Sequence, residues 1–341
     1  MVNIGLDTKG NDNGASCFIE ACLEVVKTER DVSFTIYGEK EEIKDLLRKV
    51  SRYKNVDLSS IRYNMDIVDS KETIEMNDHP VMALRTKKES SIVLATRDLI
   101  DGKIDCLISA GSTGALLAAS QFYVKPIEGI DRTVVGTIIP TKNGKTMLLD
   151  MGANMDPKAD WLYQYALIGN AYFKALYHVD RPTIGLLSVG VEENKGNALT
   201  IEAYKLLKND PTINFIGNVE ARDVSSGVCD VLICDGFSGN VLLKMYEGTA
   251  KTLFSLIKEA LKSNMLSKLG ALLIYPKLKS MLKRFDAKSY GGAPYLGCNK
   301  LIIKCHGNSE GKEVCNAIHQ AKEYIENDVT SKIKEALPKK V

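Results

Sequence analysis

Short apolar runs alternate with longer amphipathic stretches along most of the chain. The runs are rich in β-branched residues and have strand length, at 2–6, 33–37, 104–108, 133–139, 146–149, 183–189, 230–234 and 301–305. Between them, apolar residues recur at helical spacing at 15–27, 89–101, 113–121, 158–177, 197–208, 239–262 and 310–335. Strands that are apolar throughout and separated by helices are typical of a mostly parallel sheet covered on both faces. The pattern therefore predicts an α/β protein.

Composition narrows the class of protein. The 341 residues are 45% hydrophobic and 26% charged, which is typical of a globular chain. Such a length suits one α/β catalytic unit over residues 1–341, or two lobes around a cleft. The net charge of +2 argues against a nucleic-acid binder. The eight cysteines include no Cys-x-x-Cys pair, and together with the lack of a signal peptide they predict a cytoplasmic protein with reduced thiols.

Three strands run into loops that contain glycine and small polar residues. Residues 105–114 (DCLISAGSTG) resemble residues 230–239 (DVLICDGFSG), and a third strand ends in residues 148–154 (LLDMGAN). The carboxyl ends of parallel strands lie along one edge of a sheet, where ligands bind in α/β proteins. We therefore expect these loops at a ligand-binding edge.

Such junctions, in which a strand leads through a glycine-containing loop into a helix, are suited to binding an anion. Backbone N–H groups and the helix dipole point positive charge outward, and glycine permits close approach. The candidate groups are Gly111, Ser112, Thr113, Gly236, Ser238 and Gly239. Neither GxGxxG nor GxxxxGK[ST] occurs, so a nucleotide is not indicated. The alternative is that glycine and serine here only punctuate strand-to-helix turns.

Basic side chains lie near the same loops. Lys195 stands between asparagines and a glycine just after the strand 183–189, Arg85 and Lys88 precede a predicted helix start, and His306 follows the strand 301–305. Ordinary surface lysines and a turn histidine are the alternative interpretation. Because HExxH and GxSxG are absent, the sequence predicts neither a metal centre nor an acyl-enzyme.

Residues 251–288 form a basic, leucine-rich segment. Nine basic side chains stand against two acidic ones, a net charge of +7. Pro276 is expected to break the segment into two helices, with residues 269–275 as the tip of a hairpin. A basic amphipathic hairpin suits an anionic membrane surface or an acidic partner, and a dimer interface is the alternative. The candidate contact residues are Leu269, Leu272, Leu273, Lys277, Lys279 and Lys283.

Several stretches together resemble the bacterial phosphate acyltransferases of phospholipid synthesis, the PlsX family, over essentially the full chain. They are 109–115 (SAGSTGA), 149–154 (LDMGAN), 190–197 (GVEENKGN), 215–223 (FIGNVEARD), 234–241 (CDGFSGNV), 291–294 (GGAP) and 306–307 (HG). Two positions depart from the family pattern. Residues 7–12 read DTKGND where the family usually has DAMGGD, and Ser112 stands where it usually has asparagine.

The resemblance implies a three-layer α/β/α fold similar to phosphotransacetylases and to the isocitrate and isopropylmalate dehydrogenases. It implies a homodimer attached peripherally to the membrane, without a cofactor. The implied reaction is acyl-ACP (acyl carrier protein) plus inorganic phosphate giving acyl phosphate, which would feed a membrane glycerol-phosphate acyltransferase.

The residues suggest how such a reaction would proceed. Phosphate is itself a nucleophile, so no serine or cysteine relay is needed. We expect Lys195 with Arg85 or Lys88 to clamp phosphate. Asn154 and Asn240 would donate to the thioester carbonyl, and Asp150 and Asp235 would orient the lysine and the loops. An acyl-CoA-dependent phosphotransacetylase is the main alternative; an oxidoreductase of this fold and a non-catalytic membrane adaptor are weaker ones.

Overall fold

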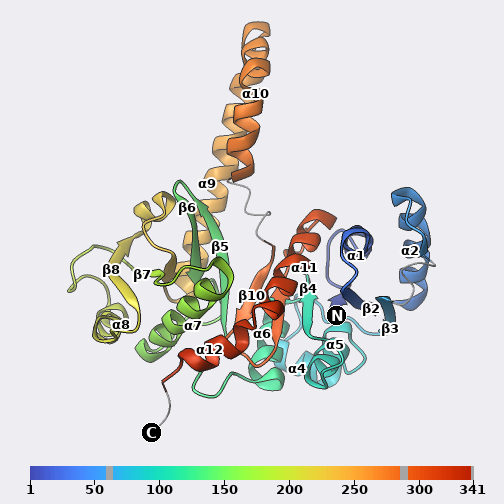
Figure 1. The fold of residues 1–341 in the computed structure, drawn as a ribbon, viewed down its shortest axis with the longest axis horizontal. Helices are drawn as coiled ribbons and strands as arrows, with labels where there is room; N and C mark the ends of the chain where they lie inside the picture. Colours follow the sequence, from blue (N-terminus) through green and yellow to red (C-terminus); the bar gives the residue numbers. More distant parts are fainter. Residues whose placement is uncertain (59–63, 285–290, 339–341) are drawn as a thin grey trace. The chain divides into compact units, whose positions relative to one another are not determined.

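The computed structural model of the chain describes residues 1–58, 64–284 and 291–338, without the side chains of 280–284. The chain divides into two compact units (Figure 1). Unit 1 comprises Met1–Thr137, Leu167–Arg181 and Tyr290–Val341, and unit 2 comprises Ile138–Ala166 and Pro182–Ser289. Strand β5 (Val134–Thr141) and helix α7 (Ala159–Tyr177) begin in one unit and end in the other.

The sheet of unit 1 follows the strand order β3-β2-β1-β4-β11-β10-β5. Its strands are β1 (Val2–Asp7), β2 (Val32–Gly38), β3 (Met65–Asp69), β4 (Cys106–Ser109), β10 (Ala293–Leu296) and β11 (Leu301–Lys304), with the first part of β5. The first four and β11 are parallel, whereas β10 is antiparallel to β11 and β5. The apolar side chains of β4 are fully buried, as a strand covered on both faces requires.

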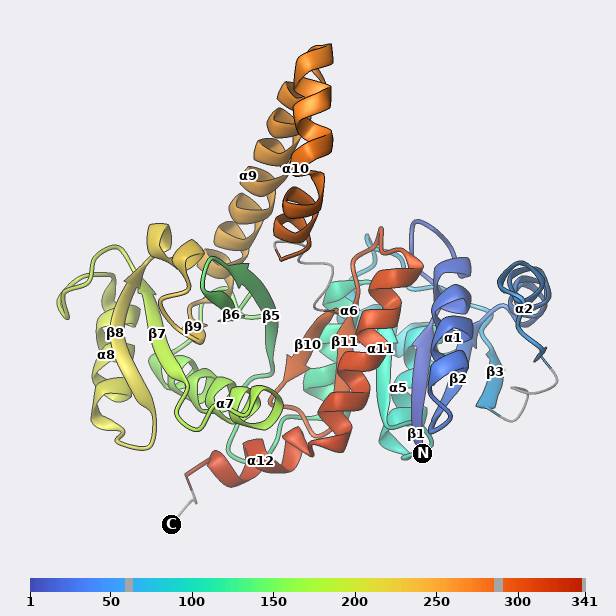
Figure 2. The same ribbon diagram turned by 45° about the horizontal axis from the view of Figure 1, so that its top comes forward.

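Helices lie on both faces of this sheet (Figure 2). They are α1 (Ser16–Thr28), α2 (Lys40–Lys54), α4 (Pro80–Thr86), α5 (Ser91–Ile100), α6 (Thr113–Ala119), α11 (Gly311–Glu326) and α12 (Val329–Ala336), and a short π-helix, Ser120–Val124, follows α6. Helix α1 packs on α11, and α5 packs on α6. The cysteines are free thiols, seven of the eight buried.

Unit 2 has the strand order β5-β6-β9-β7-β8, with β6 (Gly144–Leu149), β7 (Thr183–Ser188), β8 (Asn214–Glu220) and β9 (Val231–Ile233). Strands β6, β9, β7 and β8 are parallel. Helix α8 (Ala198–Asn209) packs on β7 and β8, and a short 3-10 helix, Ala221–Ser226, follows β8. The predicted mixed, mostly parallel α/β fold is confirmed.

Two long helices, α9 (Gly236–Lys262) and α10 (Met265–Arg284), form a hairpin that extends away from the sheet of unit 2 (Figures 1 and 2). The predicted break at Pro276 is wrong, because α10 runs through this proline. Packing of α10 along α9 offsets the backbone hydrogen bond that proline removes. The chain turns instead at Ser263 and Asn264, where the Asn264 side chain accepts from the Ser267 N–H and begins α10. Residues 269–275 therefore lie within α10 and are not the tip.

Elements at the margins of the units account for most of the other differences; the exception is β10, a four-residue strand that is buried between β11 and β5. The pattern missed β3, β8, β10, α2 and α4. Strands β3 and β8 are half-exposed edge strands, and α2 buries only Ile43 and Ser51. The single helix predicted over 310–335 is interrupted at Asp328, whose φ of 46° is left-handed. Elements that bury few side chains leave only a weak hydrophobic pattern.

Candidate functional site

The carboxyl edge of the unit 2 sheet gathers three of the predicted loops. The neighbouring parallel strands β6, β9 and β7 end at this edge, because Leu149 pairs with Ile233 and Leu186 pairs with Ile233. The loop of Asp150 follows β6, the loop of Asp235 follows β9 and the loop 189–197 follows β7. The structure thus brings the residues predicted in unit 2 to one sheet edge.

Asp150 organises its own loop. It is fully buried, and its carboxylate accepts from the N–H groups of Gly152 (3.0 Å), Ala153 (3.0 Å) and Asn154 (2.7 Å). The Asn154 side chain donates to the same carboxylate at 3.0 Å. Burial raises the pKa of Asp150, and the four hydrogen bonds oppose that rise. These hydrogen bonds fix the backbone of the loop 151–154 around the Asp150 carboxylate.

The start of α9 packs directly against this loop. Gly236 donates its N–H to the Asn154 carbonyl at 2.8 Å, and Asp235 caps the helix by accepting from the Ser238 N–H at 2.8 Å. A methyl group at Gly239 would overlap the carbonyl oxygen of Asp150. This close approach requires glycine at position 239.

Asn240 lies beside the same loop and is half-buried. A methyl group at Gly152 would lie 3.8 Å from the Asn240 Cβ. Ser238 is also half-buried at this edge. Asn154 and Asn240, the two predicted amide donors, are therefore neighbours around the Asp150 loop.

Lys195 lies on the third loop and is exposed. Its backbone is fixed by hydrogen bonds, with its N–H donating to the Glu192 carbonyl at 3.0 Å and its carbonyl accepting from Ser188 Oγ at 3.3 Å. In the part of the chain that the structure describes, the Lys195 ammonium has no ion-pair partner. The cation is available to an anionic ligand.

Unit 1 has a corresponding polar cluster at the carboxyl ends of β1, β4 and β11. Asp7 is fully buried and accepts from Ser109 Oγ at 2.6 Å and from the Lys9 N–H at 3.1 Å. Ser109 Oγ in turn accepts from the Gly111 N–H at 3.0 Å. Burial is the largest influence on Asp7 and raises its pKa. A buried carboxylate thus reaches the Gly111 loop through one hydroxyl.

Lys304 completes this cluster. Its Nζ donates to the Ala110 carbonyl at 2.9 Å and to the Cys305 carbonyl. Burial lowers the pKa of Lys304, while the charges of Asp7 and Asp12 act in the opposite direction. The loops that follow β4 and β11 thus both accept hydrogen bonds from one half-buried ammonium.

The atypical loop 7–12 is tied to its neighbours. Asn11 donates to the Ser309 carbonyl at 3.4 Å, and a methyl group at Gly10 would lie 2.7 Å from the Gly111 Cα. Lys9, which stands where the family pattern has an apolar residue, lies 3.9 Å from Glu39 and 3.8 Å from Glu42 at the start of α2. Lys9 therefore faces acidic partners within unit 1.

The remaining predicted residues of unit 1 lie at the start of α6, on α4, and in the loops that follow α4 and β11. Ser112 is buried and caps α6 by accepting from the Ala115 N–H at 3.4 Å, and Thr113 is exposed. Arg85 is exposed on α4, which packs on α6, and Lys88 and His306 are exposed. The Gly111 N–H is occupied by Ser109, so Gly111 contributes its close backbone approach and not this donor.

The predicted site residues are thus divided between the units: Lys195, Asp150, Asn154, Asp235, Gly236, Ser238, Gly239 and Asn240 in unit 2, and Arg85, Lys88, Gly111, Ser112, Thr113 and His306 in unit 1. Asp7, Ser109 and Lys304, the members of the polar cluster, were not among the residues predicted from the sequence. The available signal was a polar residue ending an otherwise apolar strand, as in VNIGLD and LIIK.

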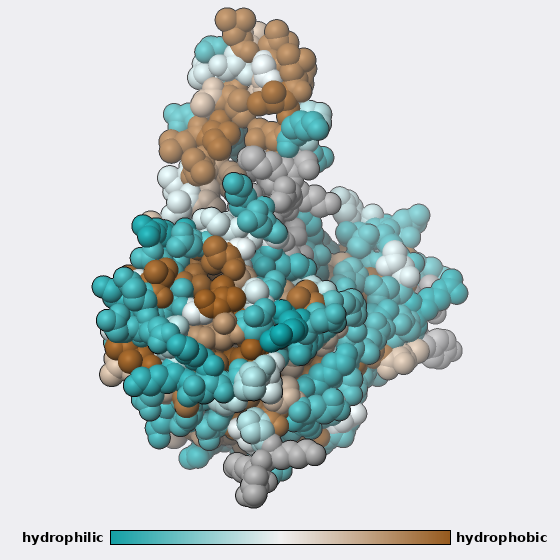
Figure 3. Space-filling model, turned by 60° about the vertical axis from the view of Figure 1, so that its left-hand side comes forward, coloured by the Kyte–Doolittle hydropathy of each residue, from teal (hydrophilic) through white to brown (hydrophobic). Residues whose placement is uncertain are grey.

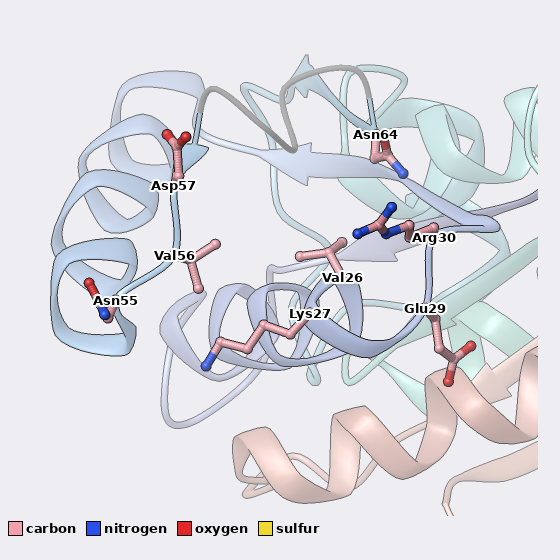
Figure 4. Close-up of a pocket in the computed structure, with 8 residues that line it drawn as sticks. All are labelled: Val26, Lys27, Glu29, Arg30, Asn55, Val56, Asp57 and Asn64. Atoms are coloured by element: carbon pink, nitrogen blue, oxygen red, sulfur yellow. The ribbon is translucent and has the colours of Figure 1, made fainter.

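A pocket of about 530 Å³ lies in unit 1, and none of the predicted site residues of that unit lines it (Figure 4). Val26, Lys27, Glu29, Arg30, Asn55, Val56, Asp57 and Asn64 line it, where α1 and α2 end and before β2 and β3 begin. It therefore belongs to the amino-terminal edge of the unit 1 sheet. Among the residues that the structure describes, no group of three or more histidine, cysteine or acidic side chains could hold a metal ion.

Solved structures with the same fold include two phosphotransacetylases. The one from Streptococcus pyogenes has a TM-score of 0.62 at 19% identity and covers 95% of this chain and 94% of its own. The EutD phosphotransacetylase from Staphylococcus aureus has a TM-score of 0.56 at 17% identity and covers 98% of this chain and 94% of its own. At such identities the likeness concerns the fold, and the predicted phosphotransacetylase-like fold is confirmed.

Similarity in sequence shows the family as well as the fold. A family model described as "Fatty acid synthesis protein" matches residues 2–332. A phosphate acyltransferase of Clostridium botulinum is 44% identical over 343 aligned positions, covering 99% of this chain and 100% of the relative. A phosphate acyltransferase of Clostridium acetobutylicum is 45% identical, covering 98% of each chain. The predicted resemblance is confirmed, and the chain belongs to the phosphate acyltransferase family.

Proposed function

We propose that this phosphate acyltransferase transfers a long-chain fatty acyl group from acyl-ACP to inorganic phosphate, giving acyl phosphate for phospholipid synthesis. The similarity to phosphate acyltransferases along the whole chain carries the proposal. The polar loops at both sheet edges support it, because they offer N–H donors, amides and cations to a phosphate and a carbonyl.

The chemistry requires little beyond binding and orientation. Phosphate attacks the thioester carbonyl carbon, the carbonyl oxygen gains negative charge, and the thiolate of the carrier leaves. Holding the reactants in place and supplying donors to the developing oxyanion are each worth several kcal/mol, about 3–4 for one well-placed donor. No covalent enzyme intermediate is needed.

In unit 2, Lys195 would bind phosphate and Asn154 and Asn240 would donate to the carbonyl oxygen. The exposed ammonium of Lys195 suits the first role, and the proximity of both asparagines to the Asp150 loop suits the second. Asp150 and Asp235 would hold these loops from within, since a bare carboxylate beside phosphate repels it. In unit 1, Arg85, Lys88 and His306 are exposed side chains for further substrate contacts.

The activity is tested by trapping acyl phosphate as a hydroxamate. Purified protein is supplied with long-chain acyl-ACP, with and without inorganic phosphate, and in parallel with the matching acyl-CoA. We expect product only when phosphate is present, and faster with acyl-ACP. Equal or faster turnover of acyl-CoA would favour a phosphotransacetylase-like enzyme, and no product from either donor would contradict the proposal.

We also propose that the α9–α10 hairpin attaches the protein to an anionic membrane surface. Apolar residues gather over the hairpin (Figure 3). Met265, Leu266, Leu269, Leu272 and Leu273 are between 61% and 82% exposed. Lys277 and Lys279 are exposed on the same helix, and the side chain of Lys283 lies outside the described residues.

An exposed apolar surface flanked by lysines suits the boundary between headgroups and acyl chains. No helix in the described ranges is long and apolar enough to cross a membrane. The acidic carrier protein and a second copy of the chain are the other proposed partners of this basic hairpin, and a membrane glycerol-phosphate acyltransferase would take the product.

The double variant Leu272→Asp/Leu273→Asp tests the membrane role. We expect co-sedimentation with phosphatidylglycerol vesicles to fall about tenfold or more while turnover of soluble acyl-ACP is largely kept. Ile216→Asp/Val228→Asp, which changes two exposed apolar residues of unit 2 outside the hairpin, is the matched control. Unchanged sedimentation would refute the membrane role, and a change of oligomeric state in ultracentrifugation would instead indicate a dimer interface.

A further inference from the structure

Two loops of unit 1 are held by one half-buried lysine. Lys304 donates to the carbonyls of Ala110 and Cys305, the residues immediately before Gly111 and His306. We infer that Lys304 is a positioning residue for substrate binding: its ammonium sets the Gly111 loop and the His306 loop in the arrangement that binds phosphate. The inference rests on the proposed function, in which both loops contact substrate.

The planarity of the peptide bond explains how hydrogen bonds to these two carbonyls orient the residues that follow them. The carbonyl of one residue and the N–H of the next lie in one rigid plane. Fixing the Ala110 carbonyl therefore fixes the peptide plane that leads into Gly111, and fixing the Cys305 carbonyl does the same for His306. Hydrogen bonds from an ammonium are about twice as strong as those between neutral groups. The two loops cannot shift independently while both carbonyls bind one Nζ.

The surroundings support a positioning role over simple packing. Burying an ammonium costs free energy unless it is hydrogen-bonded, and an apolar side chain at the end of an apolar strand would avoid that cost. The groups that face Lys304 are the carboxylates of Asp7 and Asp12 and the thiol of Cys305, whose pKa burial raises to about 12. Asp7 holds the Gly111 loop from a second direction through Ser109.

The loops also contact each other through the backbone. The Cys305 N–H donates to the Ser109 carbonyl at 2.8 Å, and the Asp12 N–H donates to the Gly307 carbonyl at 2.7 Å. Lys304 therefore stands at the junction of three chain segments. Its removal should loosen the loops together, and should not affect the amino-terminal ends of the same strands.

Lys304→Met tests the inference, because methionine keeps most of the volume and removes the ammonium. We expect the KM for inorganic phosphate to rise at least about tenfold, with kcat at saturating phosphate reduced by less than about threefold. Lys300→Met is the matched control, since Lys300 precedes the amino-terminal end of the same strand β11. Its KM for phosphate should stay within about twofold of the wild type.

Hydrogen–deuterium exchange supplies a readout that does not depend on activity. In Lys304→Met we expect the amides of Gly111 and Cys305 to exchange at least about tenfold faster, and both together. A phosphate KM within about threefold of wild type, or unchanged exchange in either loop, overturns the inference.

If Lys304→Met does not fold, Lys304→Gln replaces it. Glutamine keeps one uncharged donor, so this variant must show the same changes at smaller size. A wild-type protein that forms no acyl phosphate defeats the proposed function, and the exchange data then decide the role of Lys304 alone.

Discussion

The carboxyl edges of the two units each contain a buried aspartate, and they stabilise it differently. The carboxylate of Asp150 in unit 2 accepts from groups within the next four residues, namely three backbone N–H groups and the side chain of Asn154. Asp7 of unit 1 accepts from Ser109, which is 102 positions away, and lies in the field of Lys304. The first arrangement is local in sequence, and the second exists only after three strands have met.

The lysines of the two edges differ in burial and in hydrogen bonding. Lys304 of unit 1 is half-buried and donates to carbonyls, whereas Lys195 of unit 2 is exposed on a glycine-containing loop. A half-buried lysine that is already hydrogen-bonded can fix the position of a loop, and an exposed lysine can bind an anion from solution. The contrast concerns these two lysines: Lys304 is suited to positioning loops, and Lys195 is suited to contact with a ligand.

Lys195→Ala is expected to have the largest effect. Loss of a phosphate-binding cation should slow acyl-phosphate formation about 100-fold, which corresponds to about 2.7 kcal/mol, without changing the unfolding midpoint. Lys205→Ala, an exposed lysine of α8, is the control and should stay near wild-type activity. A fall of less than about threefold with the fold intact would remove Lys195 from the site.

Gly239→Ala tests how tightly the unit 2 loops depend on each other. The added methyl group would overlap the Asp150 carbonyl, so we expect a loss of about 2 kcal/mol of stability and a lower denaturation midpoint. Gly248→Ala lies in the same helix in open space and should be neutral or stabilising by up to about 1 kcal/mol. Equal midpoints for the two variants would show that α9 and the Asp150 loop move apart freely.

Asp7→Asn should have the smallest effect, and its sign depends on pH. Burial raises the pKa of Asp7 above 3.8, against the hydrogen bonds from Ser109, Ser91 and the Lys9 N–H and the charge of Lys304. The folded state therefore binds this proton more tightly than the unfolded chain. The resulting stability is fully present below pH 3.8 and is lost as pH rises through the folded pKa.

Asparagine does not titrate. The thermal unfolding midpoint of Asp7→Asn should therefore rise relative to that of the wild type as pH increases from below 3.8 to about 7. The change is on the order of 1 kcal/mol, comparable to one buried hydrogen bond. Thermal unfolding of both proteins across this range measures it. If the unfolding midpoint of the variant instead falls further below that of the wild type as pH rises, the fold stabilises Asp7 as the carboxylate.

Particular elements show where the sequence pattern succeeded. The apolar runs of β4 and β9 predicted buried parallel strands, and the small polar residues after them marked the two loops that resemble each other. The resemblance did not extend to the helix starts. Ser112 caps α6, whereas Asp235 caps α9 three positions before Ser238, so Gly236 is already helical. A glycine in a pattern signals a turn, and only packing against Asn154 shows that this one begins a helix.

Residues 263–276 show the converse. Pro276 is a strong local signal for a break, yet α10 passes through it because α9 packs along its length, and the turn occurs at an ordinary asparagine cap. Proline disfavours a helix interior by a few kcal/mol, and the packing of many side chains between α9 and α10 outweighs that cost.

The order of residues along the chain determined the fold class, the family and the loops that carry chemistry, because strand burial and short motifs depend on neighbours in sequence. Only the tertiary structure decided that Asp7, Ser109 and Lys304 form one cluster and that the hairpin turns at Asn264. Those contacts join residues far apart in the chain or depend on a helix packed alongside, and no local pattern records such partners.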